Sequence, residues 1–318
     1  MRTRFLWLMF VGLAVCAPAA RADYLEVRHS AHVRSEPRSD SQSLLQPLIG
    51  SFLILASTQQ TNGYYQVEIP GSTQLGFIYR TLVRRFAGDP PGAGPAPPTP
   101  ENPNAGLTKN QCITKYAGDS IGNCPTAGCG GDPRLNRAKN RTDLAQDNSP
   151  QPMTFHQIVH REDQAQEAIN ESDWKRGHPR TIFEALGEGR AVVLKGFLIE
   201  ADDSGIEACN CYISGRSNND FHLDLVAHAD HEDDRAIVVE MTPRLRPAGW
   251  RLADLQQFAA QKKYVRVTGW LMYDTMHPGS SSHRATAWEV HPVTKFEVCT
   301  GSKASCDQGN NWRDLAQP

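Results

Sequence analysis

Histidine and carboxylate side chains alternate with apolar ones in short segments of the second half of the chain. His222 and Asp224 are two residues apart, and so are Glu289 and His291. This spacing places each pair on one face of a β-strand, opposite its apolar neighbours. Imidazole and carboxylate groups bind Zn²⁺ and also act as general acids and bases. The pattern therefore allows two kinds of chemistry, metal binding and hydrolysis.

If the protein is an exported metal-dependent hydrolase, such as a nuclease, the pattern gives two overlapping sets of candidate residues, one catalytic and one metal-binding. The catalytic set takes Glu240 from a third apolar segment and consists of His222, Asp224, Glu240 and His291. The metal set takes a histidine from a loop and consists of His222, Asp224, His277 and His291, with zinc as the expected ion. The competing interpretation is that these are exposed strand residues or buried polar groups that fix the ends of a barrel. We favour this interpretation, which predicts a binding protein without catalytic residues or a cofactor.

The segments that carry these residues follow one another as three strands, a helix and two strands. The expected helix covers residues 251–262, and the expected strands cover 191–199, 221–226, 236–241, 264–271 and 285–291. This order predicts an OB-fold, a five-stranded barrel with a helix between strands three and four. Gly196 and Gly269 fall inside the first and fourth strands, where a barrel needs sharp coiling. OB barrels bind ligands on the face of strands two and three, which carry His222, Asp224 and Glu240, and this face is flanked by the loop between strands four and five, which carries His277.

Arginine and aromatic residues offer a second type of surface on the same barrel. Arg244, Arg266 and Trp270 lie in or beside the expected strands and have the chemistry to stack on a sugar or a single-stranded nucleic acid. The chain has 33 basic and 35 acidic residues and a net charge of -2, so it lacks the positive field of a nucleic-acid-binding protein. We therefore expect these residues to form a ligand-binding face and disfavour nucleic acid as the partner.

A proline-rich stretch divides the chain into two parts. Residues 89–100 contain six prolines and two glycines, a composition that forms neither helix nor sheet and gives a semi-stiff linker. We therefore expect a small domain over residues 23–86, a linker over 87–105 and a larger domain over 106–318. In the larger domain, residues 107–152 are expected to be loop, and residues 155–186 to be helical.

The small domain has strand-like runs separated by turn signals. It includes His32-Val33-Arg34-Ser35-Glu36-Pro37, Gly63-Tyr64-Tyr65-Gln66-Val67 and Gly76-Phe77-Ile78. This pattern resembles the bacterial SH3 domain, although the family has Asn in place of His32 and Trp in place of Tyr64 and Phe77. The resemblance implies binding to peptidoglycan or an envelope protein through Tyr64, Tyr65, Phe77 and Tyr79. The alternative is that these residues only build the barrel.

The expected fold class is thus mainly β, with a small SH3-like barrel and a larger α+β domain that contains the OB-like barrel. Two stretches of the larger domain, residues 131–141 and 288–298, resemble an uncharacterised class of exported bacterial proteins. That resemblance implies no activity.

The first 22 residues have the three parts of a secretory signal peptide. Arg2 and Arg4 precede an apolar run over residues 5–15, and Ala20-Arg21-Ala22 forms a small-x-small cleavage site. The run is too short to span a bilayer, and no later run is long enough. We therefore expect a periplasmic or secreted protein without a transmembrane segment. Lipid anchoring through Cys16 is the less favoured alternative, because valine precedes it where a lipoprotein site needs a small residue.

Seven of the eight cysteines remain once Cys16 is set aside. In an oxidising compartment they are expected to form disulfides, and because seven is odd at least one thiol is free or paired elsewhere. Cys209 and Cys211 are too close to favour pairing with each other, so we expect each to have a different partner. A zinc site formed by the first three cysteines is the less favoured alternative. The disulfide candidates are Cys112, Cys124, Cys129, Cys209, Cys211, Cys299 and Cys306.

Overall fold

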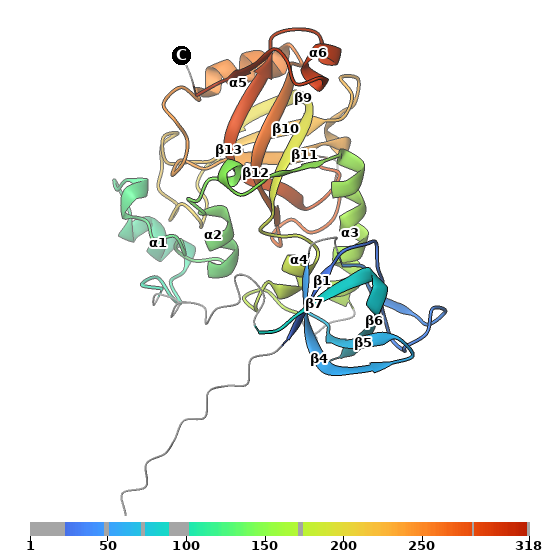
Figure 1. Ribbon diagram of the computed structural model, residues 1–318. Helices are drawn as coiled ribbons and strands as arrows, with labels where there is room; N and C mark the ends of the chain where they lie inside the picture. The colour runs from blue at the N-terminus through green and yellow to red at the C-terminus, as the bar shows by residue number, and fades with distance from the viewer. Residues whose placement is uncertain are drawn as a thin grey trace, which may run out of the picture.

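The computed structural model of the protein describes residues 23–47, 51–70, 74–88, 102–170, 174–281 and 283–316. The expected signal peptide, with Cys16, and most of the expected linker lie outside the described residues. Two β-sheets dominate the structure, one formed before the proline-rich stretch and one after it (Figure 1). The fold is therefore mainly β, as the sequence predicts. No helix within the described residues is long and apolar enough to cross a membrane.

The first sheet is antiparallel and has the strand order β3-β2-β6-β5-β4-β1-β7. Its strands are β1 (Tyr24–Val27), β2 (Val33–Arg34), β3 (Ser43–Leu45), β4 (Phe52–Thr61), β5 (Tyr64–Glu68), β6 (Leu75–Tyr79) and β7 (Val83–Phe86). The β4–β5 hairpin turns at Asn62 and Gly63, which both have positive φ, the conformation that an Asn-Gly turn favours. Leu25, Val33 and Ile78 are buried in its core.

The second sheet closes into a five-stranded barrel. Its strands are β9 (Ala191–Asp203), β10 (Phe221–Val226), β11 (Ile237–Met241), β12 (Tyr264–Tyr273) and β13 (Trp288–Cys299). They pair in the circuit β9-β10-β11-β13-β12-β9, in which only the β11–β13 pair is parallel. Helix α5 (Leu252–Ala260) lies between β11 and β12 in the chain and packs against β9. This is the strand order of an OB-fold, as the order of elements predicts.

Gly269 is required by the close approach of β12 to β13. The pairing of the two strands changes register at this residue, and a Cβ there would lie 2.6 Å from the carbonyl oxygen of Pro292 and 2.6 Å from Val290 Cγ1. We expect Gly269→Ala to lower the free energy of unfolding by about 1–3 kcal/mol in urea denaturation, because the barrel must shift to admit the methyl group. Gly122→Ala is the control, since its Cβ would meet only Ser120 Oγ, at 3.9 Å. Equal losses in the two variants would contradict the argument.

Short elements surround the barrel. They are α1 (Lys109–Lys115), α2 (Pro133–Lys139), α3 (Phe155–Asn170), α4 (Thr181–Ala185), α6 (Lys303–Asp307), β8 (Gln151–Met153) and β14 (Trp312–Asp314). Two expectations are corrected here. The segment 107–152 is not all loop, because the side chains of Thr108 and Asp132 cap α1 and α2. The helical stretch over 155–186 is two helices, and Pro179 precedes the second.

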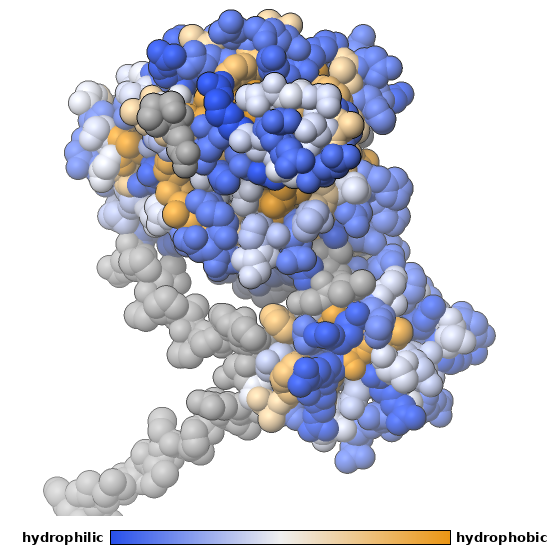
Figure 2. Space-filling model, turned by 45° about the horizontal axis from the view of Figure 1, so that its top comes forward, coloured by the Kyte–Doolittle hydropathy of each residue, from blue (hydrophilic) through white to orange (hydrophobic). Residues whose placement is uncertain are grey.

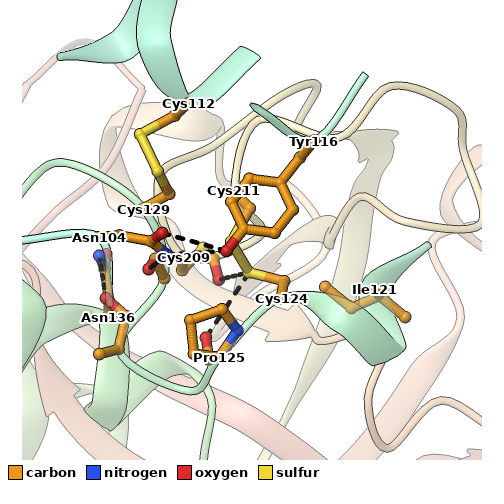
Figure 3. Close-up of a disulfide and its surroundings, with 12 residues drawn as sticks. Asn104, Cys112, Tyr116, Ile121, Cys124, Pro125, Cys129, Asn136, Cys209 and Cys211 are labelled. Carbon is orange, nitrogen blue, oxygen red and sulfur yellow. Dashed lines mark hydrogen bonds between the residues drawn. A yellow bond between two sulfur atoms is a disulfide. The ribbon is translucent and has the colours of Figure 1, made fainter. Parts of the chain in front are cut away.

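Three disulfides stabilise the second part of the chain, and Figure 3 shows two of them, Cys112–Cys129 and Cys124–Cys211. They join Cys112 to Cys129, Cys124 to Cys211 and Cys299 to Cys306. The zinc alternative for the first three cysteines is therefore wrong. The expectation that Cys209 has a partner is also wrong, because its thiol is free and buried. The pairing is compatible with an extracytoplasmic location.

The face shown in Figure 2 is mostly hydrophilic, with apolar side chains in separate patches.

Candidate functional site

Strands β10 and β11 bring three of the candidate residues together. His222 and Glu240 are direct partners across the β10–β11 ladder, and Asp224 follows His222 on the same face. His222 Nδ1 lies 3.2 Å from Glu240 Oε1, and its Nε2 lies 3.1 Å from Asp224 Oδ1. The two carboxylates are buried, whereas 28% of the His222 side chain is exposed. The imidazole thus bridges two buried carboxylates.

The charge of His222 follows from this bridge. Burial by itself would lower the pKa of the imidazole, but Asp224 and Glu240 outweigh burial and raise the pKa of His222 to about 11. At neutral pH both ring nitrogens carry protons and donate to the carboxylates. In this state the imidazole has no free lone pair with which to accept a proton, so the three residues form an ion-paired bridge between β10 and β11.

His291 on β13 joins the same cluster from the other side of Glu240. Its Nδ1 lies 2.9 Å from Glu240 Oε2 but is not aligned for a hydrogen bond, and its Nε2 lies 3.6 Å from Asp220 Oδ2. Burial would lower the pKa of His291, but Glu240 and Asp220 raise it to about 10. Asp220 was missed by the sequence analysis. The signal was present, because Asp220 precedes His222 by the same two-residue spacing that selects Asp224.

Lys139, at the end of α2, supplies a buried positive charge to the cluster. Its Nζ lies 3.4 Å from Glu207 Oε2, 3.9 Å from Glu240 Oε2 and 3.9 Å from Asp274 Oδ2. Burial alone would lower the pKa of Lys139, but the carboxylates around it raise the pKa well above its ordinary value. Sequence analysis missed this lysine, and no local pattern marks it, because its partners lie far along the chain.

The loop between β12 and β13 holds the remaining candidate histidine apart from the others. His277 Nδ1 contacts Asp274 Oδ2 at 2.8 Å, and 63% of the His277 side chain is exposed. In the same loop, Arg284 Nη1 donates to Glu289 Oε1 at 2.6 Å. The four residues of the expected metal set therefore do not converge on one point: His277 pairs with Asp274, whereas His222 and His291 both contact Glu240.

The expected arginine and aromatic residues of the barrel have separate local partners. Arg244 donates to the carbonyl oxygen of Cys124 at 2.7 Å, which fastens the disulfide-bonded segment to the barrel. Arg266 forms two hydrogen bonds to Glu297, at 2.6 and 2.7 Å. Trp270 donates to the carbonyl oxygen of Asp143. Within the described residues, these three side chains do not form one continuous surface.

Trp270 does line a cavity of about 340 Å³ between α2, α4 and β12. The guanidinium of Arg141 lies 3.5 Å from the centre of the Trp270 ring. Arg180 in the same wall pairs with Glu188, and Arg134 on α2 is exposed. The cationic side chains that line the cavity are Arg134, Arg137, Arg141 and Arg180. Glu184 and Glu188 line the cavity too, so its four guanidinium groups exceed its carboxylates by two, which favours an anionic ligand.

The first sheet has a cavity of about 450 Å³ that contains two of the four expected aromatic residues. Tyr64 and Tyr79 lie in its wall with their ring centres 5.0 Å apart, and His32 and Arg34 line it as well. Tyr65 instead packs against the apolar core, and Phe77 is half-buried. Neither Tyr65 nor Phe77 lines this cavity.

Comparison with known proteins places the chain in no family. No family model matches it, and no curated protein matches it. Among solved structures, the crystal structure of yeast Stn1 and Ten1 is similar at 14% identity, with 51% of this chain and 70% of that chain covered and a TM-score of 0.27. At this score the likeness carries no argument, and the assignment of the OB-fold rests on the strand order of the barrel.

Proposed function

We propose that the protein is an exported binding protein of the bacterial cell envelope, and that its first sheet attaches it to peptidoglycan. The cavity lined by Tyr64, Tyr79, His32 and Arg34 is the observation that carries the proposal. Peptidoglycan offers sugar faces on which aromatic rings pack and peptide carboxylates with which an arginine pairs. The three disulfides support the proposed location, because such bonds persist in oxidising compartments.

The OB-like barrel supplies a second binding face in this proposal. The cavity between α2, α4 and β12 combines the indole of Trp270 with four arginines, a combination suited to an anionic ligand of small size. Arg141 stacks on the indole ring and pairs with Asp143, and Arg180 pairs with Glu188, so Arg134 and Arg137 are the lining arginines for which the described residues show no salt bridge. The two cavities lie on different parts of the chain, so the first sheet would attach the protein while the barrel binds a second ligand.

We do not propose the hydrolase alternative, because its reacting groups are mostly buried and are paired with one another. Glu240 and His291 are 3% and 0% exposed. His222 is the most exposed member of the catalytic set, and both of its nitrogens are engaged with carboxylates. A general base must reach the proton that it removes from a bound substrate. The binding interpretation therefore fits the burial of these residues better.

Co-sedimentation of the full chain with purified peptidoglycan tests the attachment. Tyr79→Ala is expected to weaken binding by roughly five- to tenfold, about 1–1.4 kcal/mol, because it removes one aromatic wall of the cavity. Leu75→Ala is the matched control, since Leu75 is equally exposed on β6 but does not line the cavity. If the unaltered protein stays in the supernatant at low salt, the proposal is wrong. If the two variants bind equally weakly, the cavity is not the binding site.

A further inference from the structure

Polar atoms without partners are concentrated at one place in the barrel. Among the described residues, the buried side-chain atoms that lack a hydrogen bond include His291 Nδ1 and Nε2, Glu240 Oε2, Asp220 Oδ1 and Glu289 Oε2. Buried polar groups are nearly always hydrogen-bonded, and a group that is not requires an explanation such as an ion or a water molecule. Three of these atoms are carboxylate oxygens and two are imidazole nitrogens, all of which can bind one metal ion, so the five atoms on four neighbouring residues point to a shared cation.

The side chains involved have the geometry of a ligand set. One ligand atom from each of Asp220, Glu240 and His291 lies within 4.8 Å of the other two. Asp220 directly precedes β10, Glu240 lies on β11 and His291 lies on β13, so three adjacent strands of the barrel hold them. Side chains on such strands are held more firmly than side chains on loops. One imidazole nitrogen and two carboxylates are a donor set that Zn²⁺ accepts.

The charges around these residues favour a further cation. The buried carboxylates of the cluster are those of Asp220, Asp224, Glu240, Asp274 and Glu289, and Glu207 is half-buried beside them. Within the described residues, Lys139 and Arg284 are the permanent cations that contact these six carboxylates, and the imidazoles of His222, His277 and His291 contact them as well. Buried carboxylates that lack a paired cation are costly. A divalent ion would take the place of a proton on His291 and balance Asp220 and Glu240 without requiring protons on these carboxylates.

We propose that Asp220, Glu240 and His291 bind one divalent metal ion, zinc by the nature of the donors, in a closed site inside the barrel. All three side chains are buried, so the ion would lie inside the barrel, and a fourth ligand such as water would complete its tetrahedral coordination. The ion would tie together β10, β11 and β13, including the parallel β11–β13 contact, which has a single paired position. This role is independent of the proposed attachment to peptidoglycan.

A second trio of possible ligands lies beside the first. Glu207, Cys209 and Asp220 also have ligand atoms within 4.8 Å of one another, and Cys209 Sγ lies 3.7 Å from Asp220 Oδ2. Asp220 belongs to both trios. We assign the ion to the His291 side because the atoms without partners gather there, whereas Cys209 and Glu207 contact each other at 3.2 Å.

Metal analysis of the full chain, purified without a chelator from an oxidising compartment, tests the site. We expect one zinc ion per chain in the unaltered protein and only traces in Asp220→Asn and His291→Gln. Asp224→Asn is the matched control, because Asp224 is a buried carboxylate of the same cluster that contacts His222 instead of His291. Cys209→Ser is expected to keep the ion. Loss of the ion in Cys209→Ser but not in His291→Gln would overturn the assignment to this trio.

A second measurement keeps the test decisive where a variant fails to fold. The unaltered protein is stripped of metal with a chelator, and its thermal unfolding is followed while zinc is added. A ligand that binds only the folded state raises the melting temperature, and the rise increases with the logarithm of the free ligand concentration once that exceeds the Kd. We expect zinc to raise the melting temperature and calcium to leave it unchanged. Unaltered protein that contains no metal and shows no shift with zinc would overturn the proposal.

Discussion

Removal of the Cys124–Cys211 disulfide is expected to lower the free energy of unfolding by about 4–5 kcal/mol, because its sulfur atoms close the longest covalent loop in the structure. The two cysteines are 87 residues apart, whereas Cys299 and Cys306 are 7 apart. A crosslink restricts the unfolded chain more when its loop is longer, and the same relation gives about 2–2.5 kcal/mol for the shorter loop. The comparison thus predicts a difference of about 2 kcal/mol between two double-alanine variants.

The surroundings of this disulfide explain why its loss has a wide effect. Cys124 belongs to the segment that holds α1 and α2, and Cys211 follows β9, so the bond joins that segment to the barrel. The segment's own apolar core is small and consists mainly of Cys112, Tyr116, Cys124, Cys129, Cys211 and Ile213. Figure 3 shows Tyr116 beside the two disulfides of this core. Without the crosslink, few apolar contacts remain to hold α2, and with it Lys139, against the barrel.

Urea denaturation of the two double variants under non-reducing conditions measures the difference. We also expect Cys124→Ala/Cys211→Ala to show earlier proteolysis between residues 102 and 148 than the control variant. Cys209 provides an additional check: it is buried in the folded protein and is expected to react with a thiol reagent faster once the segment loosens. Equal losses of stability in the two double variants would contradict the loop-length argument.

The barrel could be predicted because its signal is local. Strand β10 places Phe221, Leu223 and Leu225 in the core by simple alternation, and the polar residues between them share the other face. The order of five such strands and one helix then identifies the OB topology without any long-range contact. In β12, Gly269 marked the point of coiling, and the structure shows the close strand approach that requires it.

The site could be predicted only in part, because much of it depends on contacts between distant segments. Strand alternation predicts that His222 and Asp224 share a face. Their contact with Glu240 depends on the register between β10 and β11, which the sequence alone does not reveal. The buried charge of Lys139 comes from a helix that precedes the barrel, so no spacing rule finds it. Disulfide pairing has the same limit, which is why Cys209 could not be distinguished from its bonded neighbours.

Glu162→Ala is expected to destabilise the protein by about 3–5 kcal/mol, because one buried carboxylate of α3 satisfies several donors at once. Its oxygens accept hydrogen bonds from the hydroxyl of Tyr273 at 2.8 Å, the hydroxyl of Thr286 at 2.8 Å and the backbone N–H of Ala287 at 2.7 Å. The backbone N–H of Gly279 donates to it at 3.1 Å. Truncation to alanine removes these acceptors and leaves the Thr286 hydroxyl and the Ala287 N–H, which are buried, without a partner.

The position of Glu162 makes this loss more than a local defect. Three of these donors belong to the connection between β12 and β13, and Tyr273 is the last residue of β12 itself. A fifth donor, Gln166 at 2.9 Å, lies on α3 one turn after Glu162. The same connection carries Asp274 and Arg284, whose side chains contact Lys139 and Glu289 of the buried cluster. The carboxylate therefore fixes the loop that completes the cluster. We expect chemical-shift changes at His222 and His291 in Glu162→Ala, although neither histidine touches Glu162.

Two further substitutions separate the hydrogen bonds of Glu162 from other effects on the helix. Glu162→Gln keeps the shape and one acceptor oxygen but turns an NH₂ group toward donors, so a loss of about 1–3 kcal/mol is expected. Glu167→Ala removes an exposed glutamate from the same helix and is expected to change stability by less than about 0.5 kcal/mol. We expect the loss of stability in thermal and urea unfolding to increase in the order Glu167→Ala, Glu162→Gln, Glu162→Ala, because the number of donors left unpaired increases in that order. Similar values for the two glutamate-to-alanine variants would mean that α3 holds the β12–β13 connection by apolar packing alone.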